Sequence, residues 1–227
     1  MTNPKADNHS SFGVIFDVDG VLIDSYAAHC ESWRQSAARR GLEMTQQMFA
    51  RTFGQTSCTV ITGLWSAANL TEQQILDFDD EKEAAYREIV KRSFPELAGA
   101  KELIQSLFEA GVPMAIGSSG PIPNVEAALD HVDPHHHVAV KVTREDIERG
   151  KPDPQVFQIA AARLGIPSAS CVVLEDAPVG VAAAHAAGSP CVGVMSTGRT
   201  REDVQEAEWI VNDLTEVDVD GLRHLAQ

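Results

Sequence analysis

The chain has few positive charges. Its 227 residues include 18 Lys and Arg against 33 Asp and Glu, and the formal net charge is −15. A field of that sign repels polyanions, which argues against a protein that binds nucleic acid or an anionic membrane surface. An anionic substrate would therefore need a positive group or a bound cation at the site itself.

Cysteine is also scarce, and its four occurrences form no metal or redox motif. Cys30, Cys58, Cys171 and Cys191 are scattered along the chain without a C-x-x-C pair. We interpret them as small apolar residues in a reducing compartment, which favours a cytoplasmic protein.

Long hydrophobic runs are missing as well. No segment approaches the roughly 18 consecutive apolar residues that a membrane span needs. The polar N-terminal stretch 1–11 lacks the apolar centre of an export signal. The sequence thus predicts neither a membrane protein nor an exported one, and it implies no protein partner.

The sequence does contain a regular alternation of short apolar runs and longer helical patterns. Six runs are predicted to be strands, at 13–16, 112–117, 137–140, 171–175, 191–195 and 209–211. Strands that alternate with helices form parallel sheets in α/β proteins. Residues 26–95 show only helical patterns, including one that ends near Gly41 and one that begins at Thr71. We therefore predict an α/β core over 11–25 and 96–227, with a helical domain inserted after the first strand.

Two carboxylates follow the first apolar run. The stretch FGVIFDVDGVL places Asp17 and Asp19 after the predicted strand, with Gly20 next. Ligands bind at the carboxyl ends of parallel strands, so this strand delivers both acids to a site. Neighbouring carboxylates suit a divalent cation or a shared proton. A calcium-binding loop is excluded, because its required glycine and glutamate would fall on Leu22 and Ala28.

Three later loops carry polar groups of matching chemistry. Ser118 and Ser119 follow the second predicted strand, where hydroxyl and backbone N–H groups can hold an anion. Lys151 lies between glycine and proline in RGKPDP, a rigid frame for one positive charge. A later apolar run ends on the adjacent acids Glu175 and Asp176. Each motif alone could equally be an ordinary loop or turn without a function, but together they supply the groups that a metal-bound phosphate requires.

In this order the four motifs resemble those of the haloacid dehalogenase superfamily, in its β-phosphoglucomutase and phosphatase-like branch with a helical cap. The matching segments are DVDGVLIDS, AIGSSG, GKPDP and LEDAPVGVAAAHAAG, and the likeness runs from about 12 to 200. The resemblance implies a Rossmann-like, doubly wound parallel sheet with an inserted α-helical cap. It also implies a Mg²⁺-dependent phosphatase that hydrolyses a small phosphorylated metabolite, such as a sugar phosphate, through an aspartyl-phosphate intermediate.

The resemblance further implies roles for individual residues. Asp17 matches the nucleophile, and Asp19 matches the general acid and base. The phosphate-binding groups would be Ser118, Ser119 and Lys151. The magnesium ligands would be Asp17, Asp19 through its backbone carbonyl, Glu175 and Asp176.

Substrate selection is expected in the cap. His29, Trp33 and Lys82 lie where the mutase branch has a histidine, a tryptophan and a lysine, although an ordinary structural role is the alternative for each. Ser57 lies where that branch carries an arginine for the second phosphate of its substrate, which favours hydrolysis. The predicted substrate-facing residues are Ser25, His29, Gln55, Thr56, Ser57 and Lys82.

The alternatives to a phosphatase are a mutase, a dehalogenase and a non-catalytic binding module. A β-phosphoglucomutase-type hexose phosphate mutase remains the main alternative, because Lys82 could hold a second phosphate. Dehalogenases of the superfamily lack the second aspartate, since a chloride leaving group needs no acid, so Asp19 favours phosphoryl transfer. A non-catalytic binding module would have little use for the complete polar set.

Overall fold

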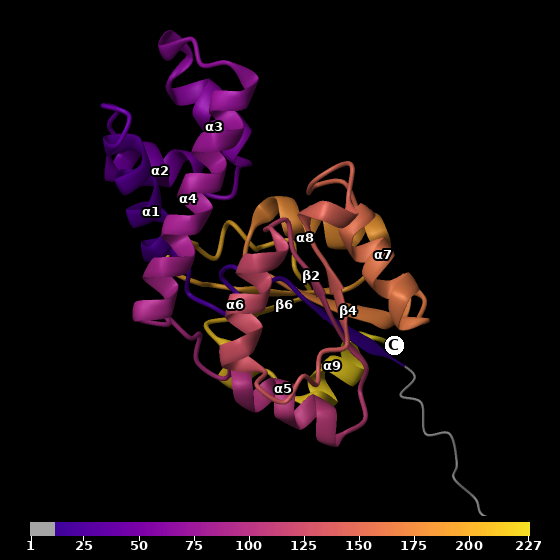
Figure 1. Cartoon of the computed structure of the whole chain (residues 1–227). Coiled ribbons are helices and arrows are strands. Elements are labelled where there is room, and N and C mark those ends of the chain that lie inside the picture. Colours follow the sequence, from indigo (N-terminus) through magenta and orange to yellow (C-terminus); the bar gives the residue numbers. More distant parts are fainter. Residues whose placement is uncertain (1–11) are drawn as a thin grey trace, which may run out of the picture. The chain divides into compact units, whose positions relative to one another are not determined.

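The computed structural model describes residues 12–227, which form two compact units (Figure 1). One unit, called the core here, contains the described residues up to Ile23 together with Glu96–Gln227. The other, called the cap, contains Asp24–Pro95. The stretch 1–11, for which we predict no export signal, and the first predicted core residue, 11, lie outside the described residues.

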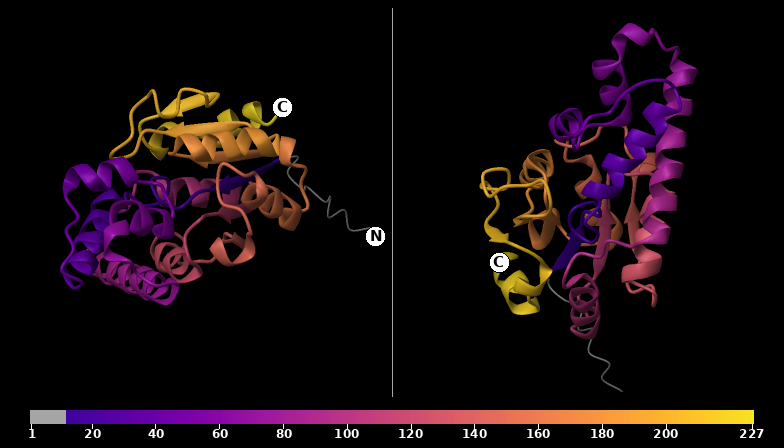
Figure 2. Two further views of the ribbon diagram at one scale, coloured as in Figure 1. Left: turned by 90° about the horizontal axis from the view of Figure 1, so that it is seen from above. Right: turned by 90° about the vertical axis from the view of Figure 1, so that its left-hand side faces the viewer.

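The core is a six-stranded parallel sheet with helices on both faces (Figures 1 and 2). The strand order is β3-β2-β1-β4-β5-β6, so the chain builds outward from β1 in one direction and then in the other. The predicted doubly wound, Rossmann-like fold is confirmed. The strands are β1 (Gly13–Phe16), β2 (Met114–Gly117), β3 (Val140–Val142), β4 (Cys171–Glu175), β5 (Cys191–Val194) and β6 (Trp209–Val211).

The central strands are apolar because both faces of the sheet are covered. Every residue of β1, β2, β4 and β5 is buried. On one face, the ring of Phe157 packs against Gly117. A Cβ at Gly117 would lie only 2.9 Å from this ring. Right-handed connections place the helices after β1 and β2 on the opposite face. The helices of the first face are α7 (Gln155–Leu164) and α8 (Pro178–Ala187), and those of the second are α5 (Ala100–Glu109), α6 (Ile122–Val132) and α9 (Val219–Leu225).

The third strand begins further along the sequence than predicted, at Val140–Val142 instead of 137–140. The carboxylate of Asp133 accepts hydrogen bonds from the backbone N–H groups of His137 and Val138, at 2.9 and 2.8 Å. Those groups are therefore unavailable to a neighbouring strand, and the segment that contains them stays a loop.

The cap is helical. Thr71 caps α4 as predicted, because its hydroxyl accepts the N–H of Gln74 and the Gln74 side chain accepts the N–H of Thr71. The predicted glycine stop of the first cap helix lies three residues beyond its end, where Gly41 adopts a φ of 68°. None of the helices in residues 12–227 is long and apolar enough to cross a lipid bilayer. The cap helices are α1 (Tyr26–Ala38), α2 (Gln46–Thr52), α3 (Ser57–Leu64) and α4 (Glu72–Arg92).

Candidate active site

The predicted acids meet where the strand order reverses. β1 and β4 are neighbours, and their register pairs Phe16 with Leu174. The next residues along both strands, Asp17 and Glu175, therefore emerge side by side at the carboxyl edge of the sheet. In an open α/β sheet, this edge at the reversal of strand order is where ligands bind.

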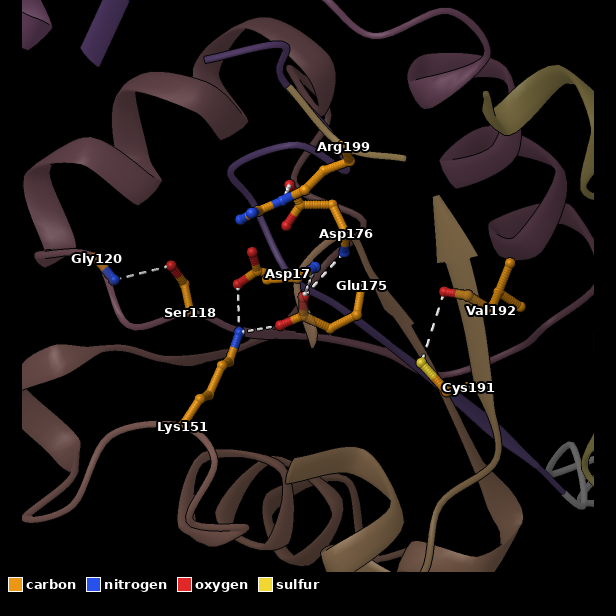
Figure 3. A network of polar contacts seen from close by, with 10 residues as sticks. Asp17, Ser118, Gly120, Lys151, Glu175, Asp176, Cys191, Val192 and Arg199 are labelled. Atoms are coloured by element: carbon orange, nitrogen blue, oxygen red, sulfur yellow. Dashed lines mark hydrogen bonds and ion pairs between the residues drawn. The ribbon is translucent and has the colours of Figure 1, made fainter. Parts of the chain in front are cut away.

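Lys151 joins the two strand ends (Figure 3). Its Nζ lies 2.7 Å from Oδ1 of Asp17 and 2.5 Å from Oε1 of Glu175. Burial works against the charge of Lys151, but the two carboxylates outweigh it and raise its pKa, so the amine stays protonated. Burial also raises the pKa of Asp17, which the positive charge of Lys151 opposes. The lysine thus balances negative charge that the fold has removed from water.

Both carboxylate oxygens of Glu175 accept hydrogen bonds. While Oε1 accepts from Lys151, Oε2 accepts from the backbone N–H groups of Asp176 and Ala177, at 2.9 and 3.0 Å. A Cβ at Gly180 would come within 1.9 Å of this carboxylate. The glycine of the LEDAPVG segment therefore lets the glutamate lie against the first turn of α8, where the positive helix end favours an anion.

Asp176 is held by two residues that the sequence reasoning missed. Its Oδ2 accepts from Ser196 Oγ and from Arg199 Nε, both at 3.0 Å. Burial raises the pKa of Asp176 to about 6, which Arg199 opposes and the charge of Glu175 reinforces. The available signal was the segment STGR, which follows the fifth apolar run as the other polar loops follow theirs.

The acids at this edge fit a small, hard cation. Oxygen atoms of Asp17, Glu175 and Asp176 all lie within 4.8 Å of one another, and no other such group occurs in residues 12–227. Gly20, with a φ of 78°, clears the space beside them, since a Cβ there would lie 2.3 Å from Oδ2 of Asp176. An all-oxygen donor set is the kind that Mg²⁺ prefers. The residues present therefore fit the predicted metal.

The predicted phosphate loop lies next to these acids. Ser118 follows β2 and is buried, and its Oγ accepts the N–H of Gly120 at 3.0 Å. A Cβ at Gly120 would lie 3.3 Å from that Oγ and 3.8 Å from Oδ2 of Asp19. The Asp19 carboxylate thus reaches the loop of Ser118, whereas Ser119 is exposed.

In the cap, two of the predicted residues come together. Lys82 Nζ lies 3.0 Å from Nδ1 of His29 and 2.7 Å from Oε1 of Glu83, which the sequence reasoning missed. The His29 ring stacks on Tyr86 with 4.1 Å between centroids. Lys82 Nζ also lies 5.4 Å from the ring of Trp33, which belongs to the apolar centre of the cap. A buried lysine is thus surrounded by one acid and three rings.

The other predicted cap residues do not join this cluster. Thr56 caps α3 by accepting the N–H of Thr59, and Ser57 is the first residue of that helix. Gln55 is exposed, and its side-chain amide donates within the cap to a backbone carbonyl. Ser25 is fully buried, and its hydroxyl has no hydrogen-bond partner within the described part of the chain.

Solved structures and curated proteins resemble this chain over most of its length. Validoxylamine A 7'-phosphate phosphatase of Streptomyces hygroscopicus subsp. limoneus is 31% identical over 204 residues, which cover 89% of this chain and 94% of the relative. Hexitol phosphatase A of Escherichia coli (strain K12) is 30% identical over 217 residues, covering 91% and 93%. β-Phosphoglucomutase of Bacillus subtilis (strain 168) is 29% identical over 190 residues, covering 80% and 82%.

The fold comparison agrees with these relatives. CbbY of Rhodobacter sphaeroides, solved in complex with phosphate, superposes with a TM-score of 0.85 at 22% identity and covers 92% of this chain and 98% of its own. A family model described as haloacid dehalogenase-like hydrolase matches residues 13–188, a span that contains all four polar loops predicted from the sequence. The chain belongs to the haloacid dehalogenase-like hydrolase family.

Proposed function

We propose that this protein is a phosphatase that hydrolyses a small phosphorylated metabolite, with sugar phosphates and related polyol phosphates as the favoured class. The observation that carries the proposal is the buried contact of 2.7 Å between Lys151 and Asp17, at an edge that also presents Asp19, Ser118 and Asp176. Two of the curated relatives named above are phosphatases by name, one of hexitols and one of validoxylamine A 7'-phosphate, which supports this substrate class.

Asp17 would be the nucleophile. Lys151 binds its Oδ1 and fixes the carboxylate, so the other oxygen can attack phosphorus. That step forms an oxygen–phosphorus bond to Asp17 as the bond from phosphorus to the substrate oxygen breaks. The charge of Lys151 then also stabilises the phosphoryl oxygens, since it lies within contact distance of the reacting carboxylate.

Asp19 would transfer the proton. Its carboxylate lies near the Ser118 loop, where the phosphoryl group would be held by the Ser118 hydroxyl and the adjacent backbone N–H groups. As an acid, Asp19 donates its proton to the departing alkoxide of the substrate. As a base, it then takes a proton from water, which attacks phosphorus and releases inorganic phosphate from Asp17.

We also propose Mg²⁺ as the cofactor. Asp17, Asp176 and the backbone carbonyl of Asp19 would hold it, with Glu175 as a further contributor. When bound, Mg²⁺ neutralises negative charge on the phosphoryl group. A local positive charge matters here because the net charge of −15 repels an anionic substrate from most of the surface.

A hexose phosphate mutase is the second candidate, and the buried Lys82 of the cap favours it as a group that could hold a second phosphate. Ser57 argues against it, because a serine hydroxyl contributes only about 0.5–1.5 kcal/mol where an arginine would form a bidentate, charged contact. A mutase must also retain its bisphosphorylated intermediate while the sugar reorients in the site. Without strong binding of the second phosphate, water should take the phosphoryl group from Asp17.

The test is a phosphate-release assay over sugar phosphates, hexitol phosphates, phosphoglycolate and nucleotides, with Mg²⁺ or with EDTA. We expect release from several sugar or hexitol phosphates with Mg²⁺, and little with EDTA. No release from any substrate would contradict the proposal. A parallel sample receives β-glucose 1-phosphate with a trace of the 1,6-bisphosphate. Rapid formation of glucose 6-phosphate with little free phosphate would replace the phosphatase with the mutase.

A further inference from the structure

The carboxylate of Asp176 is held at one of its two oxygens. Ser196 Oγ and Arg199 Nε both donate to Oδ2, each at 3.0 Å. Figure 3 shows the Asp176 carboxylate between the guanidinium of Arg199 and the side chain of Asp17. Ser196 and Arg199 lie beyond the span 13–188 that the family model matches, and the proposed reaction gives neither of them a role.

These contacts are buried and come from one tight turn. The side chain of Asp176 is 4% exposed and that of Arg199 is 11% exposed. The N–H of Arg199 donates to the carbonyl of Ser196 at 3.0 Å, so the backbone fixes one donor relative to the other. A Cβ at Gly20 would lie 2.3 Å from Oδ2 and 2.8 Å from Ser196 Oγ, so this meeting point depends on a glycine.

We propose that Ser196 and Arg199 are positioning residues for the divalent cation. By occupying Oδ2 of Asp176 they direct the remaining oxygen, Oδ1, to the ion. The inference rests on the proposed function for the metal itself. A carboxylate that is already held in place has less freedom to lose when it binds a cation, and such outer partners commonly change metal affinity by about 10–100-fold.

A rival explanation is that Arg199 supplies only positive charge to a buried carboxylate. The variant Arg199→Lys separates the two explanations, because lysine keeps the charge but replaces a planar donor with a mobile ammonium group. Positioning predicts that Arg199→Lys weakens Mg²⁺ binding about ten-fold. Ser196→Ala removes a neutral donor at the same oxygen and should weaken binding on the order of five-fold. Charge alone predicts that Arg199→Lys binds Mg²⁺ as tightly as the wild type.

The experiment is isothermal titration calorimetry of Mg²⁺ into the full chain without substrate. Ser189→Ala is the matched control for a buried hydroxyl, since Ser189 is 2% exposed and bonds the carbonyl of Ser168. Arg201→Lys is the control for an exposed arginine two residues further along. Both controls should bind Mg²⁺ like the wild type. Unchanged dissociation constants for Arg199→Lys and Ser196→Ala, or changes no larger than in the controls, would overturn the inference.

Phosphate release from the same samples separates this inference from the proposed function. If the wild type binds Mg²⁺ but hydrolyses nothing, and the two variants still bind it more weakly, the proposed function fails and the positioning role stands. If the wild type hydrolyses phosphate esters while the variants bind Mg²⁺ normally, the function stands and the positioning role fails. A wild type that binds no Mg²⁺ would also overturn the inference.

Discussion

The core and the cap both bury charged side chains, but they bring them together in different ways. In the core, Asp17 and Lys151 are separated by 134 positions in the sequence and meet because parallel strands end at one edge. In the cap, Lys82 and Glu83 are neighbours within one helix and are buried among aromatic rings. A sheet edge therefore assembles a site from distant loops, whereas the cap cluster depends on how its helices pack.

The comparison predicts different consequences for substitutions in the two units. An isosteric substitution such as Asp17→Asn at the core edge should remove chemistry and leave the fold intact, because Lys151 keeps its second partner, Glu175. A substitution in the cap cluster should lower stability or change substrate preference, because its groups lie within the packed helices. Five experiments test this division, from the largest expected effect to the smallest.

Asp17→Asn should abolish turnover. The amide keeps the size of the side chain but is a very poor nucleophile, so phosphate release should fall by at least about 10³-fold. The assay uses the best substrate of the panel, and circular dichroism checks that the fold is retained. Asp220→Asn, a change at an exposed side chain of α9, is the control and should be fully active. Substantial hydrolysis by Asp17→Asn would remove Asp17 from its role.

Lys82→Met should destabilise the cap without abolishing chemistry. It deprives Glu83 of an ion pair in which the two side chains are only 5% and 9% exposed, and removing one partner of a buried pair costs about 3 kcal/mol of unfolding free energy. Urea denaturation measures the loss. Lys101→Met is the control, since its pair with Glu96 is partly exposed to solvent, with side chains 40% and 29% exposed, and should contribute less than about 1 kcal/mol. Equal losses would mean that the cap pair contributes no more to stability than the more exposed pair of Lys101 and Glu96.

Mg²⁺ affinity should depend on pH through Asp176. Burial raises the pKa of this carboxyl to about 6, and a cation needs its ionised form. The dissociation constant for Mg²⁺, measured by calorimetry, should therefore rise up to about ten-fold for each pH unit below 6. A constant value between pH 5 and pH 7 would contradict this.

The stability of the metal-free protein should change with pH in the opposite direction to Mg²⁺ affinity, falling as the pH rises. Unfolded Asp176 loses its proton near its usual pKa of about 4, whereas the folded carboxyl keeps it up to about 6. Across that range the unfolded state binds fewer protons, so the free energy of unfolding falls as the pH rises. Urea titrations measure the trend, and Asp176→Asn should reduce its slope, while the raised pKa of Asp17 contributes a remaining trend of the same sign.

Ser57→Arg should have the smallest effect. Arginine at the first position of α3 would add a bidentate anion-binding group, so bisphosphorylated sugars should bind about three- to ten-fold more tightly. Inhibition constants against a monophosphate substrate measure this. Ser57→Gln, which is long but uncharged, is the control. Equal gains for monophosphates and bisphosphates would show that position 57 does not recognise a second phosphate.

Much of the core could be predicted because its signals are local in the sequence. A strand buried on both faces must be a continuous apolar run, and a charge at its end must lie at the sheet edge. Asp17, Glu175 and Asp176 could be recognised by that rule. The third strand was misplaced because Asp133 takes two N–H groups into a loop, a contact between residues four and five apart that the apolar pattern does not show.

The class of fold, the helical insertion and the polar loops could be predicted from the amino-acid sequence alone, because strand and helix periodicities and glycine positions are local patterns in the sequence. Which side chains contact one another at the site depends on the three-dimensional fold. Ser196 and Arg199 meet Oδ2 of Asp176, and Glu175 turns one oxygen to Lys151, because neighbouring strands place their ends together. Such contacts depend on strand order and side-chain packing, which no local pattern in the sequence specifies.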